Sequence, residues 1–172
     1  MVKGILVDKK VIVENEEDAN TIYNRGKYGV IKNRKLELSL VEALYLIEKG
    51  DLEVYDENEN KLEFKEFMKI ASERIPRFYT IFSVYRDIRS RGYITKTALK
   101  YGADFRVYER GAEPGKEHAK WILYCVHESE EFDWKKFSSM NRVAHSVRKT
   151  LLIGVVDDEG DVTYWNTTWL KP

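Results

Sequence analysis

A proline divides the longest helical pattern in this chain of 172 residues. Apolar residues recur at helical spacing over 63–74, Pro76 interrupts the pattern, and the spacing resumes over 77–91. Proline lacks a backbone N–H and its ring clashes with the preceding turn, so a straight helix cannot pass through this position. A chain of this length forms either one domain with a large core or two small ones. We therefore expect two domains, covering 1–76 and 77–172, that meet near Pro76.

The first 76 residues alternate short strands with capped helices. Asn15 precedes an acid-rich turn, and Ser39 stands three residues before Glu42, which is the spacing of a capping box. Gly50 is placed to end the second helix. The expected strands cover 4–13, 28–31 and 52–55, and the expected helices cover 15–26, 39–50 and 63–74. This order predicts a small α/β domain with short strands and three helices.

The second segment is richer in strands. Ala119 to Val126 has the β-branched and aromatic content of a buried strand, and Asp133 can cap a helix whose apolar stripe reaches Val147. Further helices are expected over 77–91 and 96–101, and further strands over 104–108, 150–156 and 161–169. We therefore predict a mixed β-sheet flanked by helices, which gives the whole chain an α+β fold class.

Charge is distributed unevenly along the chain, although its formal net charge is zero. Residues 1–75 carry a net charge of −3, residues 76–150 carry +6 and residues 151–172 carry −3. The middle block is therefore where an anion would bind. The single Cys125 cannot form an internal disulfide, the N-terminal apolar stretch is too short for a secretory signal, and no apolar run is long enough to span a membrane. We expect a cytoplasmic protein with no membrane partner.

Three residues of the second segment could together cleave RNA without a metal or other cofactor: Tyr108, His118 and Lys149. RNA carries its own nucleophile, the 2′-hydroxyl, so cleavage needs a base for that proton, an acid for the departing 5′-oxygen and charge near the phosphate. An imidazole of pKa ~6.5 suits the acid, whereas a phenol of pKa ~10 acts as a base only when cations lower its pKa. Lys149 or Arg148 could supply that cation and face the phosphate. Taken singly, each residue is more often structural, so spacing alone does not establish an enzyme.

Longer sequence motifs surround these three residues. The motifs are YITK at 93–96, KYGADFRVY at 100–108, PGKEHA at 114–119 and NRVAHSVRK at 141–149. Two less specific motifs lie nearer the N-terminus: RGKYG at 25–29 and LSLVEALYL at 38–46. Together they cover nearly the whole chain and resemble the archaeal tRNA-splicing endonucleases. The resemblance implies an N-terminal assembly domain over 1–76 and a restriction-endonuclease-like catalytic nuclease domain over 77–172.

The activity that this resemblance implies is the excision of introns from precursor tRNA at bulge–helix–bulge splice sites. The products would be a 2′,3′-cyclic phosphate and a 5′-hydroxyl, and no metal would take part. In this family, the residue that matches Tyr108 is the general base, the match of His118 is the general acid, and the match of Lys149 stabilises the transition state.

The same resemblance implies contacts with the RNA. Arg142 matches the position that clamps a flipped bulge base, because a flat cation or an aromatic ring can stack on such a base. Trp165 is favoured over its neighbour Tyr164 as the second member of this clamp, with burial at an interface as the alternative for Trp165. Arg148 completes the expected RNA-binding set.

The acidic turn of the last hairpin has two interpretations. Its residues Asp157, Asp158, Glu159 and Asp161 form either a solvated tip or, by the resemblance, a loop that enters a basic cleft of a neighbouring subunit. In the second case this acidic loop and the C-terminal strand would hold a homotetramer. Two other hypotheses are a noncatalytic RNA-binding or structural subunit of a splicing endonuclease complex, and a metal-dependent nuclease on DNA junctions. The latter needs a carboxylate pair that the sequence does not supply.

Overall fold

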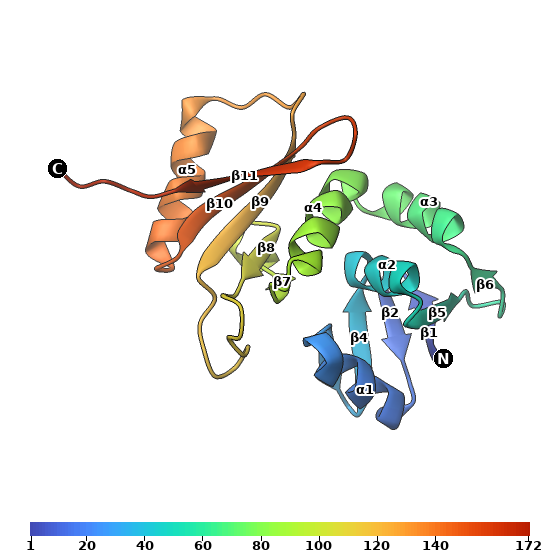
Figure 1. Ribbon diagram of the computed structural model, residues 1–172. Coiled ribbons are helices and arrows are strands. Elements are labelled where there is room, and N and C mark those ends of the chain that lie inside the picture. The colour runs from blue at the N-terminus through green and yellow to red at the C-terminus, as the bar shows by residue number, and fades with distance from the viewer. The chain divides into compact units, whose positions relative to one another are not determined.

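The computed structural model describes residues 1–172 and divides the chain into two compact units (Figure 1). The first unit covers 1–82 and the second covers 83–172, so the boundary along the chain falls within helix α4 (Phe78–Ser90). The α+β fold class predicted from the sequence is confirmed, since each unit holds a mixed sheet with helices. No helix of the structure combines the length and the apolar character that crossing a membrane requires.

Six short strands form the sheet of the first unit, in the order β3-β4-β2-β1-β5-β6. The strands are β1 (Val2–Val7), β2 (Lys10–Val13), β3 (Val30–Lys32), β4 (Lys35–Ser39), β5 (Leu52–Tyr55) and β6 (Lys61–Leu62). The helices are α1 (Glu16–Gly26), α2 (Leu40–Lys49) and α3 (Phe64–Arg74). Strands β1 and β5 run parallel, and the other neighbours run antiparallel. The prediction of short strands and three helices is confirmed.

Two hairpins depart from the expected strands of this unit. The single strand expected over 4–13 is wrong, because the chain turns at Asp8, which has a φ of 53°, and returns as β2. Strand β4 was not predicted. It follows a two-residue turn at Asn33 and Arg34, whose positive φ angles match the turn that suits the twist of a hairpin.

Glu42 fixes the junction between β4 and α2. Its carboxylate accepts hydrogen bonds from the Ser39 N–H and hydroxyl, both at 2.9 Å, and Ser39 caps the helix in return. The same carboxylate accepts the Gly29 N–H at 3.0 Å. Gly29 has a φ of +69°, and a Cβ atom there would lie 2.4 Å from the Glu37 carbonyl oxygen, so the position requires glycine. The predicted capping box is confirmed.

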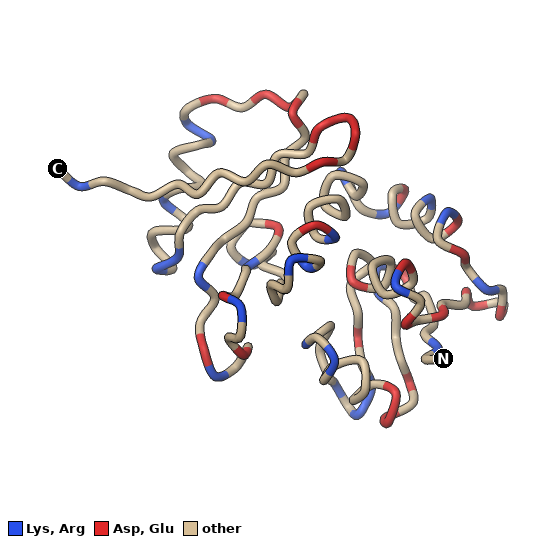
Figure 2. Tube along the Cα trace, viewed as in Figure 1, with Lys and Arg blue, Asp and Glu red and all other residues tan.

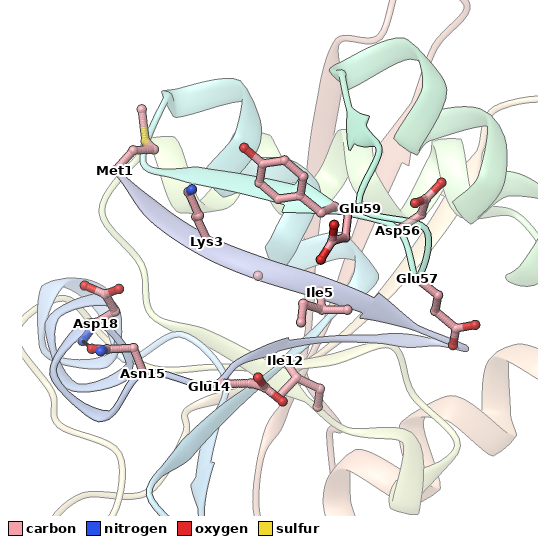
Figure 3. A pocket seen from close by; sticks show the side chains of 12 residues that line it. Met1, Lys3, Ile5, Ile12, Glu14, Asn15, Asp18, Asp56, Glu57 and Glu59 are labelled. Atoms are coloured by element: carbon pink, nitrogen blue, oxygen red, sulfur yellow. Dashed lines mark hydrogen bonds between the residues drawn. The ribbon is translucent and has the colours of Figure 1, made fainter.

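Helices cover only one face of this first sheet. The strand residues on the covered face are buried: Leu6, Val11, Val13, Leu36, Leu38, Leu52 and Val54. On the opposite face, Ile5 and Tyr55 border a hollow of about 610 Å³ whose rim carries several carboxylates (Figure 3). The alternation of buried and exposed residues along each strand is what an antiparallel sheet with one solvated face requires.

Five strands form the sheet of the second unit, in the order β11-β10-β9-β8-β7. They are β7 (Thr95–Thr97), β8 (Phe105–Val107), β9 (Trp121–His127), β10 (Thr150–Val156) and β11 (Val162–Thr167). Strands β9 and β10 are parallel and joined by helix α5 (Trp134–Ser146), while the other neighbours are antiparallel. The predicted mixed sheet flanked by helices is therefore confirmed (Figure 1).

Helices cover both faces of this second sheet. On one face, Met140 and Ala144 of α5 belong to the same buried cluster as Ile122 of β9. On the other face, α4 approaches so closely that a Cβ atom on Gly154 would lie 2.9 Å from a methyl group of Val84. A residue of β9, β10 or β11 therefore faces either α5 or α4, according to its parity along the strand.

The short helix expected over 96–101 is largely wrong. Thr95, Lys96 and Thr97 form β7 instead, and only Leu99–Tyr101 forms a single 3-10 turn. Thr95 is fully buried, which suits a β-branched residue in a strand paired with β8. Tertiary pairing thus outweighs the local helical pattern at this position.

Candidate active site

The topology of the second sheet brings Tyr108, His118 and Lys149 to one end of that sheet. Tyr108 directly follows β8, His118 lies shortly before β9, and Lys149 directly precedes β10. Strand β8 runs antiparallel to β9, whereas β10 runs parallel to it. The end of β8 therefore lies beside the starts of β9 and β10, and the three residues singled out from the sequence are neighbours in the fold.

Ala119 links two of these residues directly. The Lys149 ammonium donates a hydrogen bond of 2.9 Å to the Ala119 carbonyl oxygen. Ala119 also packs with Tyr108 and Ala112 in a small buried apolar cluster. Because His118 precedes Ala119 in the chain, its backbone is held beside both Tyr108 and Lys149.

Tyr108 is held by an arginine that the sequence reasoning missed. The tyrosine is only 5% exposed, and its hydroxyl accepts a hydrogen bond of 3.3 Å from Nε of Arg106. A second guanidinium nitrogen of Arg106 donates to the Thr97 carbonyl oxygen at 2.9 Å. The cation beside the phenol is thus Arg106, where the sequence favours Lys149 or Arg148. The missed signal was the spacing of two residues on a strand, which puts Arg106 and Tyr108 on the same face.

His118 ends an ordered loop between β8 and β9. The Lys116 and Glu117 N–H groups donate to the Glu113 carbonyl oxygen, and the Lys116 ammonium pairs with the Glu113 carboxylate at 3.0 Å. The imidazole of His118 is exposed and makes no hydrogen bond within the chain. Both of its ring nitrogens are therefore free to exchange protons with a bound ligand.

Positive charge at this end of the sheet is only partly neutralised. Lys120 pairs with Glu109 at 3.0 Å, but Arg106, Arg148 and Lys149 make no ion pair. Figure 2 shows basic and acidic residues interspersed along the loop between β8 and β9. Arg148 is exposed in the turn before β10, where its φ is 59°. These unpaired cations give the site a positive potential that favours a phosphate.

The neighbours Tyr164 and Trp165 lie on opposite faces of β11. Tyr164 pairs with Gly154 in the register and faces α4, where its hydroxyl donates to the Asp87 carboxylate at 2.8 Å. Burial and this hydrogen bond raise the pKa of Tyr164 well above its usual range. Trp165 pairs with Ile153 and is 61% exposed on the face that α5 covers. Of the two aromatics, Trp165 alone offers an open ring on the same side of the sheet as α5.

Arg142 lies on α5 beside a cleft. The cleft has a volume of about 670 Å³ and runs between α5 and the chain after β11, from Phe137 to Trp169. Arg142 is exposed and its guanidinium donates to the Ser139 hydroxyl at 3.2 Å. At the far wall, the rings of His145 and Trp169 meet edge to face with centroids 4.0 Å apart. An exposed guanidinium and an aromatic ring thus border one groove.

The acidic hairpin tip contains two kinds of carboxylate. Asp157 is structural, because one of its oxygens accepts the Glu159 and Asp161 N–H groups, both at 2.9 Å. Asp158 projects outward, 85% exposed, and lies 3.1 Å from Nε2 of His127. Figure 2 shows acidic residues along the turn between β10 and β11. The carboxylates of Asp158, Glu159 and Asp161 are exposed and are therefore more accessible to a partner than that of Asp157.

Comparison with known protein families identifies the chain as an RNA-processing enzyme of two domains. Residues 78–164 match the family described as tRNA intron endonuclease, catalytic C-terminal domain. Residues 2–68 match the family described as tRNA intron endonuclease, N-terminal domain. Pro76 lies between the two matches, and α4 belongs to the second one.

Several complete tRNA-splicing endonucleases are similar to this chain over most of their length. The tRNA-splicing endonuclease of Methanothermobacter thermautotrophicus is 40% identical over 171 residues, covering 99% of both chains. That of Pyrococcus abyssi is 39% identical and covers 99% of this chain and 98% of its own. That of Nanoarchaeum equitans is 47% identical over 142 residues, covering 79% of this chain and 90% of its own. The chain therefore belongs to the tRNA intron endonuclease family, whose members are RNA lyases that excise introns from precursor tRNA.

Proposed function

We propose that this chain cleaves precursor tRNA at bulge–helix–bulge splice sites, with Tyr108 as general base, His118 as general acid and Lys149 as the cation that stabilises the transition state. The observation that supports this assignment is that Tyr108 and Lys149 both lie at Ala119, the residue that follows His118, at one end of the second sheet. A phenol, an imidazole and an ammonium are the groups that the reaction needs. The pairing of β8, β9 and β10 supports the assignment, because the chain segments that carry these groups end or begin at the same edge of the sheet.

The reaction balances without water. The 2′-oxygen attacks the phosphorus, and its proton passes to the ionised Tyr108 phenol. The bond from phosphorus to the 5′-oxygen breaks, and the departing oxygen takes a proton from the His118 imidazolium. The products are a 2′,3′-cyclic phosphate and a 5′-hydroxyl. A positioned acid or base typically contributes about 10²–10⁴-fold each, so orientation and the charge of Lys149 supply the remainder of the acceleration.

The Lys149 ammonium is suited to contact the phosphate while keeping its position. An ammonium has three N–H donors, and the Ala119 carbonyl oxygen engages one of them at 2.9 Å. The other two donors are left for the oxygens of a bound phosphate, where charge develops in the transition state. Arg148, exposed in the adjacent turn, extends this positive surface along the RNA backbone.

We further propose that Arg142 and Trp165 stack on a bulge base. Both side chains are exposed, and both belong to the α5 side of the second sheet. Single-stranded bases in bulges are recognised by stacking on guanidinium planes and aromatic rings. Tyr164 does not serve this purpose, because its hydroxyl is engaged by Asp87 on the opposite face.

The assembly proposed for the enzyme is a homotetramer. Asp158, Glu159 and Asp161 would enter a basic cleft of a neighbouring subunit, and the C-terminal strand β11 would pair with its counterpart. β11 is an edge strand, and exposed edges are templates for pairing with another chain. The large apolar residues Trp165, Trp169 and Leu170 are exposed on and after this strand, which suits burial between subunits.

Cleavage of labelled RNA in excess EDTA tests the proposed function. A bulge–helix–bulge RNA should be cut to a fragment ending in a cyclic phosphate, while a matched duplex without bulges should stay intact. Binding without cleavage would instead indicate a noncatalytic subunit, and cleavage that appears only after a divalent metal is restored would indicate a metal-dependent nuclease.

His118→Ala provides the matched control within the chain. Because His118 is exposed and makes no hydrogen bond in the chain, its loss should leave the fold and RNA binding intact while lowering cleavage by about 10²–10⁴-fold. A loss of binding as large as the loss of cleavage would contradict its role as proton donor.

A further inference from the structure

The hydroxyl of Tyr108 has one polar partner in the chain, and that partner is cationic. Nε of Arg106 donates to this hydroxyl at 3.3 Å. The tyrosine is 5% exposed and packs with Ala112 and Ala119, so water has little access to its ring. A charge beside a group in such a partly desolvated place acts more strongly than it would in water.

Arg106 is held in place from a second side. Its Nη1 donates to the Thr97 carbonyl oxygen at 2.9 Å. In the register of the sheet, Arg106 lies opposite Lys96 of β7 and Ile122 of β9. Arg106 makes no ion pair, so its positive charge is not cancelled by a carboxylate. The planar guanidinium thus connects the end of β7 with the phenol of Tyr108, because two of its nitrogens donate to different groups.

Each of the other chain segments near the phenol also carries a charged or titratable group. Lys149 approaches from the turn after α5 and is engaged by the Ala119 carbonyl oxygen. His118 comes from the loop before β9 and is exposed. Glu109, the next residue after Tyr108, is paired with Lys120 at 3.0 Å. Of these groups, none makes the direct hydrogen bond to the phenol that Arg106 makes.

We propose that Arg106 is a positioning residue that enables Tyr108 to act as the base of the cleavage reaction. The guanidinium stabilises the phenolate by charge and by hydrogen bonding, and it fixes the direction in which the phenolic oxygen points. The inference rests on the proposed role of Tyr108. It assigns to Arg106 the cation that a tyrosine base requires, and it leaves Lys149 for the phosphate.

A titration that does not depend on RNA measures the first part of the proposal. The ultraviolet absorbance of tyrosinate is followed against pH for the full chain and for Tyr108→Phe, and the difference between the two curves isolates Tyr108 among the tyrosines. The same two titrations, with Tyr108 and with Tyr108→Phe, are then repeated in chains that also carry Arg106→Gln or Arg106→Met. Two neutral replacements are used so that a folding defect in one of them leaves the measurement available in the other.

Removal of the guanidinium should raise the pH at which Tyr108 ionises, because an adjacent opposite charge favours the charged form. Arg106→Lys keeps a positive charge but lacks the fork, so its midpoint should lie between those of the natural chain and the neutral variants. An unchanged midpoint in a folded neutral variant would overturn the proposal.

The pH dependence of single-turnover cleavage measures the second part. For each pH unit by which the phenol is harder to ionise, Arg106→Gln should cleave about tenfold more slowly near neutral pH. The two rates should converge at alkaline pH, where the phenol is ionised in both proteins. A loss by the same factor at every pH would mean that Arg106 only holds the fold together, and the inference would fail.

The two measurements separate this inference from the proposed function. If the natural chain does not cut bulge–helix–bulge RNA but the titration shifts, then the coupling between Arg106 and Tyr108 stands and the assigned activity fails. If the natural chain cuts the RNA and neither the titration nor the pH profile responds to Arg106, then the activity stands and the role of Arg106 fails.

Discussion

Lys149 donates a hydrogen bond of 2.9 Å to the carbonyl oxygen of Ala119, the residue that follows His118 in the chain. This bond ties the turn between α5 and β10 to the loop that carries the imidazole. It also directs an ammonium group toward the end of β8, where Tyr108 packs against Ala119. A single lysine thus has two effects at once, since it anchors the loop of His118 and brings positive charge to the proposed phosphate site.

Lys149→Met should separate the loss of chemistry from the loss of binding. Methionine keeps much of the aliphatic stem but cannot donate to the Ala119 carbonyl oxygen or to a phosphate. Removal of one donor aimed at developing charge typically costs about 10²–10³-fold in rate, so single-turnover cleavage should fall by at least that much. RNA affinity, measured by fluorescence anisotropy, should change much less.

Lys149→Arg is the control for this experiment, because it keeps the charge while altering the reach and shape of the donor. Its rate should lie between those of the natural chain and Lys149→Met. Wild-type cleavage by the methionine variant would remove Lys149 from the mechanism.

Trp165→Ala should weaken RNA binding, whereas Tyr164→Phe should not. Stacking of a base on an aromatic ring is worth ~1–3 kcal/mol, so the loss of the exposed Trp165 ring should raise the Kd accordingly. Tyr164 faces α4 and hydrogen bonds to Asp87, so removing its hydroxyl leaves the RNA face untouched. Equal effects of the two substitutions on anisotropy would rule out the clamp.

The acidic hairpin should respond differently to changes at Asp157 and at Asp158. If the proposed homotetramer forms through this loop, charge reversal of Asp158 and Glu159 to lysine should shift tetramers towards dimers, because lysines would repel the basic cleft proposed to receive them. Asp157→Ala should mainly reduce stability, since the Glu159 and Asp161 N–H groups lose their common acceptor. Light scattering reports the mass and thermal unfolding reports the stability. An unchanged mass after double charge reversal would contradict the assembly role.

Much of the fold could be predicted because local chemistry and tertiary structure agree. Ser39 and Glu42 form the capping box that their spacing indicated, and Asp133 caps α5 through the Lys136 N–H. The helix prediction failed where pairing with another strand decides the outcome, as at Lys96 and Thr97, which pair with Arg106 and Phe105 of β8. Periodicity within one segment contains no information about such a partner.

The candidate site shows the same division. The residue types of Tyr108, His118 and Lys149 indicated their chemistry, but their closeness depends on the order of β8, β9 and β10, which the sequence reasoning did not specify. Arg106 could have been found, because its spacing of two residues from Tyr108 in the predicted strand 104–108 places both side chains on one face. The choice between Tyr164 and Trp165 was open, since only the register with β10 reveals which ring faces which helix.

The hydrogen bond between Tyr164 and Asp87 predicts a loss of stability at alkaline pH. Burial, followed by the bond to Asp87, raises the pKa of Tyr164 above its ordinary value in the folded chain. The unfolded chain therefore releases this proton above pH ~10 while the folded chain retains it. The stabilisation is fully present below the unfolded pKa and declines as pH rises toward the folded pKa.

In Tyr164→Phe this part of the decline should be absent, so its free energy of unfolding should fall less steeply above pH ~10. Urea unfolding of both proteins across that range checks the slope, with Tyr79→Phe as a control because Tyr79 is half exposed. Parallel slopes for all three proteins would contradict the linkage.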